Sequence, residues 1–182
     1  NTGSFYAYGA QAEAGSYPTS YIPTYSVSAT RAQDVCNKTN ASDLIGTEFT
    51  LFFDGYQSIE SQYSRYIVLK GLGSTYANFI SIETNPNNKV GVNVNAGSAV
   101  FTATTQRTSG ERLKMALRCK DNDFAFYING VLIKSQTSGS VPVTSDLYLG
   151  YYTDYAENYN VINQTQIYKE ALTNAELATL TT

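Results

Sequence analysis

The stretch FAFYINGVLIKS (Phe124–Ser135) decides the fold class of this 182-residue chain. Two runs rich in apolar residues flank Asn129–Gly130, and Asn and Gly are the residue types that most readily take the positive φ angles of a two-residue hairpin turn. RLKMALRC (Arg112–Cys119) precedes this hairpin, and KDND (Lys120–Asp123) is a polar turn between them. The sequence therefore predicts an antiparallel meander over residues 112–135.

Similar short runs, bounded by Gly, Asn, Asp, Ser and Pro, recur along most of the chain. This spacing is typical of two antiparallel sheets packed face to face. The predicted strands are Ser4–Glu13, Ala32–Cys36, Glu48–Asp54, Arg65–Lys70, Asn78–Glu83, Lys89–Asn95, Ala99–Thr104, Arg112–Lys120, Asp123–Ile128, Val131–Ser135, Asp146–Tyr151 and Asn160–Tyr168.

A helical pattern occurs only at the C-terminal end, in ALTNAELATLTT (171–182). Thr173 is a suitable N-cap and Glu176 lies three residues further on, which is the spacing of a capping box. We therefore expect an all-β protein, an antiparallel two-sheet β-sandwich of the jelly-roll type, with a short C-terminal helix. The length suits a single domain of residues 1–182.

The charge of the chain argues against two classes of partner. Charged residues make up 15% of the sequence and the formal net charge is -3. Binding to nucleic acid or to an anionic membrane surface needs a concentration of positive charge, so we expect neither partner. The apolar runs are too short to span a bilayer, and we expect no membrane insertion. The start at Asn1, without methionine, suggests a module of a longer exported protein, so we expect an extracellular location.

Histidine is absent and the only cysteines are Cys36 and Cys119. The lack of imidazole excludes triads and zinc sites that depend on it. The two cysteines can form one disulfide in an exported protein, or both can be buried free thiols on strands. Spacing in the sequence does not decide between these two alternatives.

Two segments resemble a known family. FYAYGAQAEAGSYPTSYIPTYSVSATRAQDV (5–35) is similar to a stretch common in tail-fibre and surface proteins of bacteriophages and of Bacteroidetes-type bacteria. FAFYINGVLIKSQTSG (124–139) and IYKEALTNAELATLTT (167–182) resemble the closing half of a concanavalin A-like or laminin-G-like domain. The resemblance implies a jelly-roll sandwich with a glycan-binding or adhesive role. Its motifs mark the scaffold, so no functional residue is transferred from it.

The carboxylates of the sequence do not have the pattern of a glycan-cleaving enzyme. Such an enzyme is expected to place its acid and its nucleophile on one face of a strand at alternating positions, and no Glu-x-Asp-x-x-Glu pattern occurs. The nearest pairs are Asp121 with Asp123 and Asp154 with Glu157. Both read more simply as solvated turns, so we expect no enzymatic activity and no required cofactor.

Calcium is the metal that the acidic turns suit best, because it prefers several carboxylate, amide and backbone oxygens. Asp121 and Asp123, with Asn122 between them, are the first candidate ligands. A second group is Asp154, Glu157 and Asn158. An ordinary hairpin turn explains KDND equally well, and part of the case for a structural calcium comes from the family resemblance.

Tyrosine dominates the aromatic composition, with sixteen tyrosines and no tryptophan. A tyrosine ring offers a flat apolar face to the C–H side of a sugar, and its hydroxyl can bond to a sugar hydroxyl. The loop GYYTDYAENYN (150–160) lies between two predicted strands, where large rings have little core to enter. We predict that it binds carbohydrate through Tyr151, Tyr152, Tyr155 and Tyr159 as stacking residues, and through Asp154, Glu157, Asn158 and Asn160 as hydrogen-bonding residues.

A second segment, DGYQSIESQYSRY (54–66), has a similar composition. It predicts a second wall of the same surface, formed by Tyr56, Gln57, Tyr63 and Arg65. The alternative for all these tyrosines is packing on the sheets, since Tyr is a good strand residue.

These observations predict a non-catalytic carbohydrate-binding module, part of a phage tail-fibre or bacterial surface protein. Two alternatives stay open. One is a carbohydrate-binding module attached to a secreted glycoside hydrolase. The other is a structural or protein-adhesion domain whose tyrosines pack against a neighbouring chain.

Overall fold

The structure is a computed structural model that describes residues 4, 6, 9–12, 21–25, 27–30, 35–57, 63–71, 77–85, 87–108, 110–150 and 160–182, with the backbone alone at 57 and 160. The chain divides into two compact units, Asn1–Asp34 and Val35–Thr182. The single domain over 1–182 stays a prediction.

The N-terminal unit contains no strand or helix within its described residues. The Ile22 amide donates a hydrogen bond to Gln11 Oε1 at 2.7 Å. Gly9 has a φ of 77°, which interrupts an extended run, and Tyr6 is 99% exposed. The predicted strand Ser4–Glu13 is therefore wrong for its described residues, 4, 6 and 9–12, which form no strand. An extended segment becomes part of a sheet only when it pairs with a neighbouring strand.

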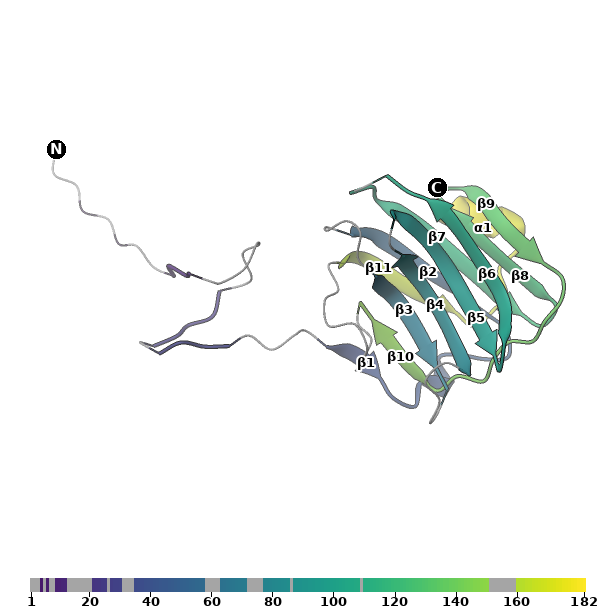
Figure 1. The fold of residues 1–182 in the computed structure, drawn as a ribbon, viewed down its shortest axis with the longest axis horizontal. Helices are drawn as coiled ribbons and strands as arrows, with labels where there is room; N and C mark the ends of the chain where they lie inside the picture. Colours follow the sequence, from purple (N-terminus) through teal and green to yellow (C-terminus); the bar gives the residue numbers. More distant parts are fainter. Residues whose placement is uncertain are drawn as a thin grey trace. The chain divides into compact units, whose positions relative to one another are not determined.

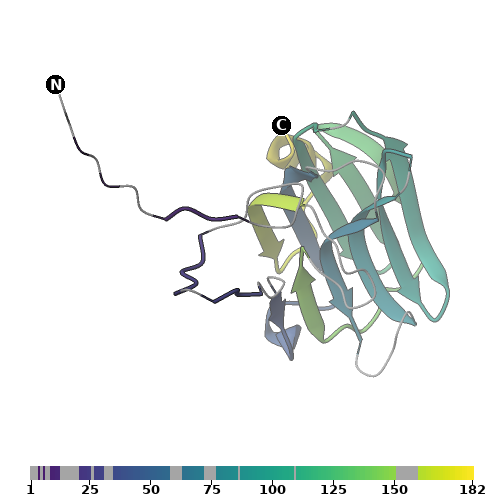
Figure 2. The same cartoon turned by 60° about the vertical axis from the view of Figure 1, so that its left-hand side comes forward.

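Residues Val35–Thr182 form two antiparallel sheets, as the sequence predicted (Figures 1 and 2). The six-stranded sheet has the order β1 (Cys36–Lys38), β10 (Asp146–Leu149), β3 (Ser64–Lys70), β4 (Asn78–Asn85), β5 (Lys89–Ala96), β6 (Ala99–Gln106). The five-stranded sheet has the order β11 (Asn160–Tyr168), β2 (Phe49–Gln57), β7 (Leu113–Lys120), β8 (Asp123–Ile128), β9 (Val131–Gln136). A short 3-10 helix, η1 (Ala41–Asp43), follows β1.

Most of the predicted strands differ from the observed strands by one to three residues at one or both ends. Two of the strands whose bounds differ are β1 and β10. The strand predicted at Ala32–Cys36 is β1, which begins only at Cys36. The strand predicted to end at Tyr151 is β10, which ends at Leu149. At Gly150 the φ angle is 64°, a left-handed conformation that ends the extended chain.

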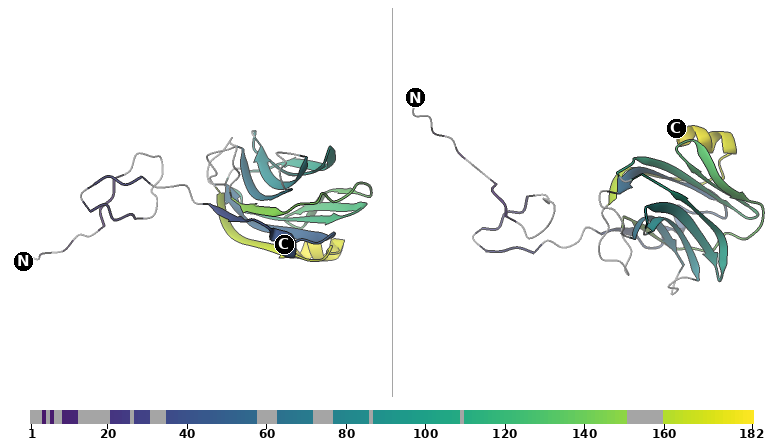
Figure 3. Two further views of the ribbon diagram at one scale, coloured as in Figure 1. Left: turned by 90° about the horizontal axis from the view of Figure 1, so that it is seen from below. Right: turned by 45° about the horizontal axis from the view of Figure 1, so that its top comes forward.

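The core lies between the two sheets, which Figure 3 shows as two layers. Phe49, Leu51 and Phe53 alternate along β2 and are fully buried, because successive side chains of a strand point to opposite faces. The Phe53 ring lies 4.3 Å from the Tyr66 ring of β3. Burying each such side chain contributes roughly 1.5–3 kcal/mol to stability.

The Asn-Gly hairpin is confirmed. Asn129 and Gly130 have φ angles of 47° and 79°, and β8 pairs with β9 on either side of them. In the preceding polar turn, Asn122 has a φ of 59°, which asparagine tolerates better than most residues. The meander of residues 112–135 is therefore β7, β8 and β9, in that order in the sheet.

Helix α1 (Asn174–Leu180) covers the outer face of the five-stranded sheet (Figure 3). Leu177 is fully buried against Phe52 and Tyr127. The predicted capping box is present: Thr173 Oγ1 accepts from the Glu176 amide, and the Glu176 carboxylate accepts from the Thr173 amide at 2.7 Å. The bond from the Thr173 amide is the main reason that the pKa of the Glu176 carboxyl is lowered, since it favours the charged form.

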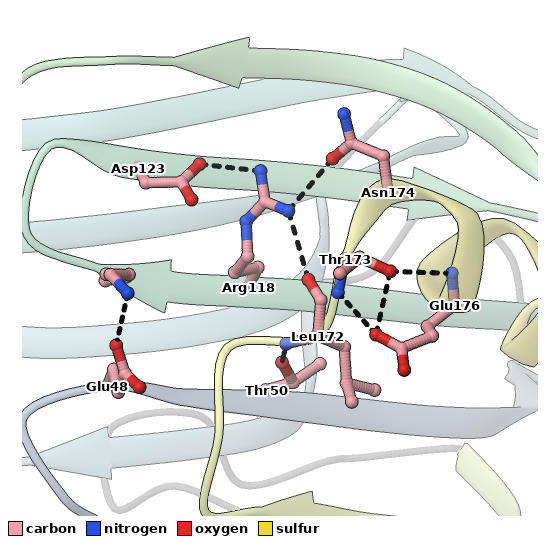
Figure 4. A network of polar contacts seen from close by, with 9 residues as sticks. Glu48, Thr50, Arg118, Asp123, Leu172, Thr173, Asn174 and Glu176 are labelled. Atoms are coloured by element: carbon pink, nitrogen blue, oxygen red, sulfur yellow. Dashed lines mark hydrogen bonds and ion pairs between the residues drawn. The ribbon is translucent and has the colours of Figure 1, made fainter.

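Arg118 of β7 fastens the segment that leads into α1 (Figure 4). Its guanidinium donates to the Leu172 carbonyl oxygen at 3.0 Å and to Asn174 Oδ1 at 2.9 Å. Thr50 of the neighbouring strand adds a bond from the Leu172 amide, 3.0 Å long. The helix is thus held by polar bonds from two strands as well as by its apolar face.

The two cysteines are free. Cys36 is exposed on the edge strand β1, whereas Cys119 of β7 is buried in the core. Burial raises the pKa of the Cys119 thiol, because the thiolate would be desolvated. The disulfide alternative is therefore wrong for this structure, and the alternative of two buried thiols is right for Cys119 alone.

Among the residues that the structure describes, no helix combines the length and the apolar character needed to cross a bilayer.

Candidate functional site

A polar surface lies on the outer face of the six-stranded sheet over parts of β4, β5 and β6, separate from the apolar cluster that contains Val68 and Phe79. Along β4, Ile80 and Ile82 point into the core, so Ser81, Glu83 and Asn85 point to the opposite face. The antiparallel registers place these residues in rows across the sheet. One row is Ser81, Asn93 and Thr102, and the next row is Glu83, Gly91 and Thr104. The sheet therefore presents rows of amides and hydroxyls that cross β4, β5 and β6.

Glu83 is the buried centre of this surface, with a side chain that is 7% exposed. One carboxylate oxygen, Oε2, accepts from Arg65 Nε at 3.3 Å and from Ser81 Oγ at 2.8 Å. The other, Oε1, accepts from Asn93 Nδ2 at 2.5 Å. The Arg65 guanidinium also lies over the Phe79 ring, 5.1 Å from its centroid. A charge is stable in such a buried place only when it is paired and hydrogen-bonded, as Glu83 is.

A hollow of about 470 Å³ lies over these rows. Its size is within the range of small-molecule sites. The residues that line it are Tyr63, Glu83, Asn85, Asn87, Lys89, Asn93, Thr102 and Thr104. The lining combines one aromatic ring with amides, hydroxyls and charged groups, which is a set that can bind a ligand with many hydroxyl groups.

Gly91 explains why the sheet is hollow here. A Cβ atom at this position would lie 2.2 Å from the Ala103 carbonyl oxygen and 2.8 Å from Thr104 Cγ2. Because the backbone atom cannot move aside freely, glycine is required for the close approach of β5 and β6. The row between Glu83 and Thr104 therefore lacks a side chain at its middle position.

The second predicted wall is divided between the two outer faces. Tyr63, which is 42% exposed, lines the hollow, and Arg65 contacts Glu83 beneath it. Tyr56 belongs to β2 in the other sheet. It is four residues after Phe52 in this strand, so both side chains point to the outer face that α1 covers. Gln57 also belongs to β2, and the structure describes only its backbone. The structure thus brings Tyr63 and Arg65 together and separates Tyr56 from them.

Near Tyr56, the outer face of the five-stranded sheet contains an ion pair. Asp54 is 4% exposed, and Arg112 donates to both of its oxygens, with Nε at 2.7 Å and Nη2 at 2.5 Å. Asn163 of β11 donates a longer bond of 3.4 Å to the same carboxylate. The hydrogen bonds from Arg112 are the main reason that the pKa of Asp54 lies below its ordinary value.

The tyrosine-rich loop lies outside the described residues. This applies to Tyr151, Tyr152, Asp154, Tyr155, Glu157, Asn158 and Tyr159, while Asn160 is described by its backbone. The residue before the loop is placed: the Gly150 amide donates to the Tyr66 carbonyl oxygen at 2.9 Å. Tyr66 lies near the start of β3, and Ser64 at that start pairs with Thr84 near the end of β4. Gly150, the last described residue before this segment, therefore lies at the same end of the sheet as Tyr63 and Asn85.

The candidate calcium ligands in the KDND turn have protein partners. Asp123 Oδ1 accepts from Arg118 Nη2 at 2.6 Å (Figure 4), and Asp121 Oδ1 accepts from the Val141 amide at 2.7 Å. Among the described residues, no group of three or more His, Cys, Asp or Glu side chains is placed to hold a metal ion. Asp154, Glu157 and Asn158 lie outside the described part, and calcium binding stays a prediction.

Sequence reasoning missed most of the polar surface. The sequence predicts strands over FISIE (79–83), KVGVNVN (89–95) and AVFTAT (99–104), but none of their residues is among those predicted to bind carbohydrate. The signal was present as a period of two, since Ser81 and Glu83 alternate with isoleucines, and Asn93 and Asn95 flank Val94. Such alternation is also what any half-exposed strand shows, so it marks a functional face only when the register places the polar residues side by side.

No family model matches the sequence, and no curated protein matches it. Solved structures do match. The carbohydrate-binding module CBM40 of Ruminococcus gnavus IT-sialidase, bound to α2,3-sialyllactose, has a TM-score of 0.65 and 14% identity over 78% of this chain and 86% of that chain.

Two further structures show how widely this fold occurs. A mutant of NanB sialidase from Streptococcus pneumoniae matches with a TM-score of 0.65 and 15% identity, over 79% of this chain and 26% of that chain. A pentraxin from Limulus polyphemus matches with a TM-score of 0.58 and 15% identity, over 75% of this chain and 70% of that chain. At these identities the likeness concerns the fold alone: the chain has the antiparallel β-sandwich fold that is also found in sialidase carbohydrate-binding modules.

Proposed function

We propose that the protein is a non-catalytic carbohydrate-binding module and that the hollow on the outer face of the six-stranded sheet is its binding site. The observation that carries the proposal is the arrangement around Glu83. A buried carboxylate is held by bonds from Arg65, Ser81 and Asn93, and side chains with hydroxyl and amide groups surround it. A sugar offers many hydroxyl groups that both donate and accept, and so it suits such a lining.

Tyr63 supplies the aromatic part of the site. Its ring lines the hollow beside Asn85 and Asn87. Aromatic side chains bind well at interfaces because the ring is apolar and the hydroxyl polar. Gly150, which precedes the tyrosine-rich segment 151–159, lies at this end of the sheet, and we propose that the segment adds stacking rings to the same surface.

We also propose that the protein is extracellular and forms part of a longer chain. The match with the sialidase module from Ruminococcus gnavus covers 86% of that chain. The match with NanB sialidase covers only 26% of that chain. That match favours the alternative of a module attached to a glycoside hydrolase. A phage tail-fibre or bacterial surface protein, which the N-terminal sequence resembles, is the other host that we propose.

A glycan array that contains lactose, α2,3-sialyllactose, α2,6-sialyllactose and plant and bacterial polysaccharides tests this function. Thr104→Arg places a long side chain in the hollow, because Thr104 is an exposed lining residue. Ser135→Arg is the matched control, since Ser135 is an exposed residue of the edge strand β9 in the other sheet.

We expect the wild-type protein to bind at least one glycan, with an affinity that falls at least about tenfold in Thr104→Arg and stays unchanged in Ser135→Arg. Both variants should keep the melting temperature of the wild type. Wild-type protein that binds no glycan contradicts the proposed function. Equal affinity of Thr104→Arg and wild type contradicts the proposed site.

A further inference from the structure

We propose that Glu83 is a positioning residue that fixes the orientation of the Asn93 side-chain amide, so that the hollow presents a hydrogen-bond acceptor to its ligand. The effect on ligand selection rests on the proposed function. The orientation of the Asn93 amide is a property of the protein alone. At the Asn93 oxygen, the site would then select a ligand hydroxyl group that donates its hydrogen.

The two carboxylate oxygens of Glu83 have different hydrogen-bond partners. Oε2 of Glu83 accepts from Arg65 and from Ser81, whereas Oε1 accepts from Asn93 Nδ2 at 2.5 Å. A carboxylate paired with arginine accepts hydrogen bonds and has none to donate. The Asn93 atom that faces it must therefore be the nitrogen, because the amide oxygen would meet a second acceptor.

The planarity of the amide decides the rest. Its oxygen and nitrogen are attached to the same carbon and point in different directions, so the Asn93 oxygen is turned away from Glu83. Asn93 lies between Ser81 and Thr102 in the register of the sheet, and it lines the hollow while being only partly exposed. The fixed amide thus turns its oxygen, an acceptor, away from Glu83, while the second N–H of its nitrogen stays available as a donor.

The consequence concerns ligand selection. A sugar hydroxyl can donate to the Asn93 oxygen, whereas a fluorine atom at the same carbon cannot donate. In Glu83→Gln the new amide can present either its N–H groups or its oxygen to Asn93, so both orientations of Asn93 become accessible. The discrimination between hydroxyl and fluorine should then shrink.

The first arm of the test needs no ligand. In the NMR spectrum of the wild-type protein, we expect one Asn93 side-chain amide proton to exchange slowly and to show a coupling across the hydrogen bond to the Glu83 carboxyl carbon. Exposed Asn37 serves as the control for a fast-exchanging side chain. An Asn93 amide that exchanges as fast as that of Asn37 overturns the proposal.

The second arm uses variants. Ser81→Ala removes another bond to Glu83 and leaves the Asn93 contact, so it should keep the slow proton. Glu83→Gln should lose it. Because Glu83→Gln also removes the charge that pairs with the buried Arg65, the folding of this variant is checked by circular dichroism. Should this variant not fold, the wild-type and Ser81→Ala spectra still decide the matter.

The third arm measures binding of lactose and α2,3-sialyllactose and of their monodeoxyfluoro analogues. For wild type and Ser81→Ala, we expect one fluorine position to lower affinity by about tenfold, the size of one lost hydrogen bond. In Glu83→Gln this penalty should fall to less than about threefold. An unchanged penalty overturns the selection role. If neither sugar binds wild type, the proposed function fails for these glycans, while the NMR arm alone decides the role of Glu83.

Discussion

Glu83 and Asp54 are both carboxylates buried on the outer faces of the two sheets, but their surroundings differ. Glu83 lines the hollow, whereas Asp54 is held by Arg112 and is not among the lining residues. We therefore expect Asp54 to contribute to stability and not to binding. The pKa of Asp54 is lowered in the folded protein, so its contribution depends on pH in a direction that can be stated.

The direction follows from proton linkage. A carboxyl whose pKa is lower in the folded state stabilises the protein above its unfolded pKa, about 3.9 for aspartate, and the contribution is lost as the pH falls through the folded value. For Asp54→Asn, we predict a deficit in unfolding free energy that is largest above about pH 4 and that shrinks below it. Urea unfolding of both proteins between neutral and acidic pH measures this. A deficit that is the same at every pH contradicts the prediction.

The tyrosines of the loop are the second matter at the scale of single residues. If Tyr155 and Tyr159 stack on sugar rings, each change to alanine should remove about 1–3 kcal/mol of binding free energy. The free energy of unfolding should change by less than about 0.5 kcal/mol. Affinity and melting temperature, measured on the same proteins, separate this from packing. Unchanged affinity with a large loss of stability would show that the rings belong to a core.

At the scale of elements, we expect changes in helix α1 to alter the free energy of unfolding and to leave glycan affinity unchanged. It lies on the outer face of the five-stranded sheet, while the hollow lies on the outer face of the other sheet. Thr173→Ala should lower the unfolding free energy by about 1 kcal/mol, because the helix loses its N-cap. Leu177→Ala should lower it by about 2–5 kcal/mol, because Leu177 is fully buried.

Thr179→Ala is the matched control for α1, since Thr179 is an exposed residue of the same helix. It should leave the unfolding free energy almost unchanged. Glycan affinity, measured where each variant is folded, should stay that of the wild type in all three. A fall in affinity in Leu177→Ala without unfolding would mean that the two faces of the sandwich are coupled.

The sequence predicts most of the elements for reasons that are local. The Asn129–Gly130 turn needs only two residues with positive φ, and the cap of α1 needs only Thr173 and Glu176. Both are confirmed. The strand predicted at Ser4–Glu13 fails for the opposite reason: a strand depends on a partner strand, and alternation in the sequence does not supply one.

At the scale of the whole molecule, the site depends on relations that no local pattern contains. Arg65, Glu83 and Asn93 belong to three consecutive strands of the sheet, and their contacts follow from the register. Tyr56 and Tyr63 are close in sequence and yet belong to different outer faces, because β2 and β3 lie in different sheets. Composition indicates tyrosine and carboxylate residues as candidates for binding. Only the order of the strands in the sheets shows which of them lie on the same face.

The central claim is that carbohydrate binds to the outer face of the six-stranded sheet. The most direct measurement is a titration of the isotopically labelled protein, followed by NMR, with the glycan that has the highest affinity in the array. We predict that the backbone amides of Glu83, Gly91, Asn93 and Thr104 show the largest shift changes. Changes confined to β7, β8 and α1, or no changes with any glycan, would contradict the claim.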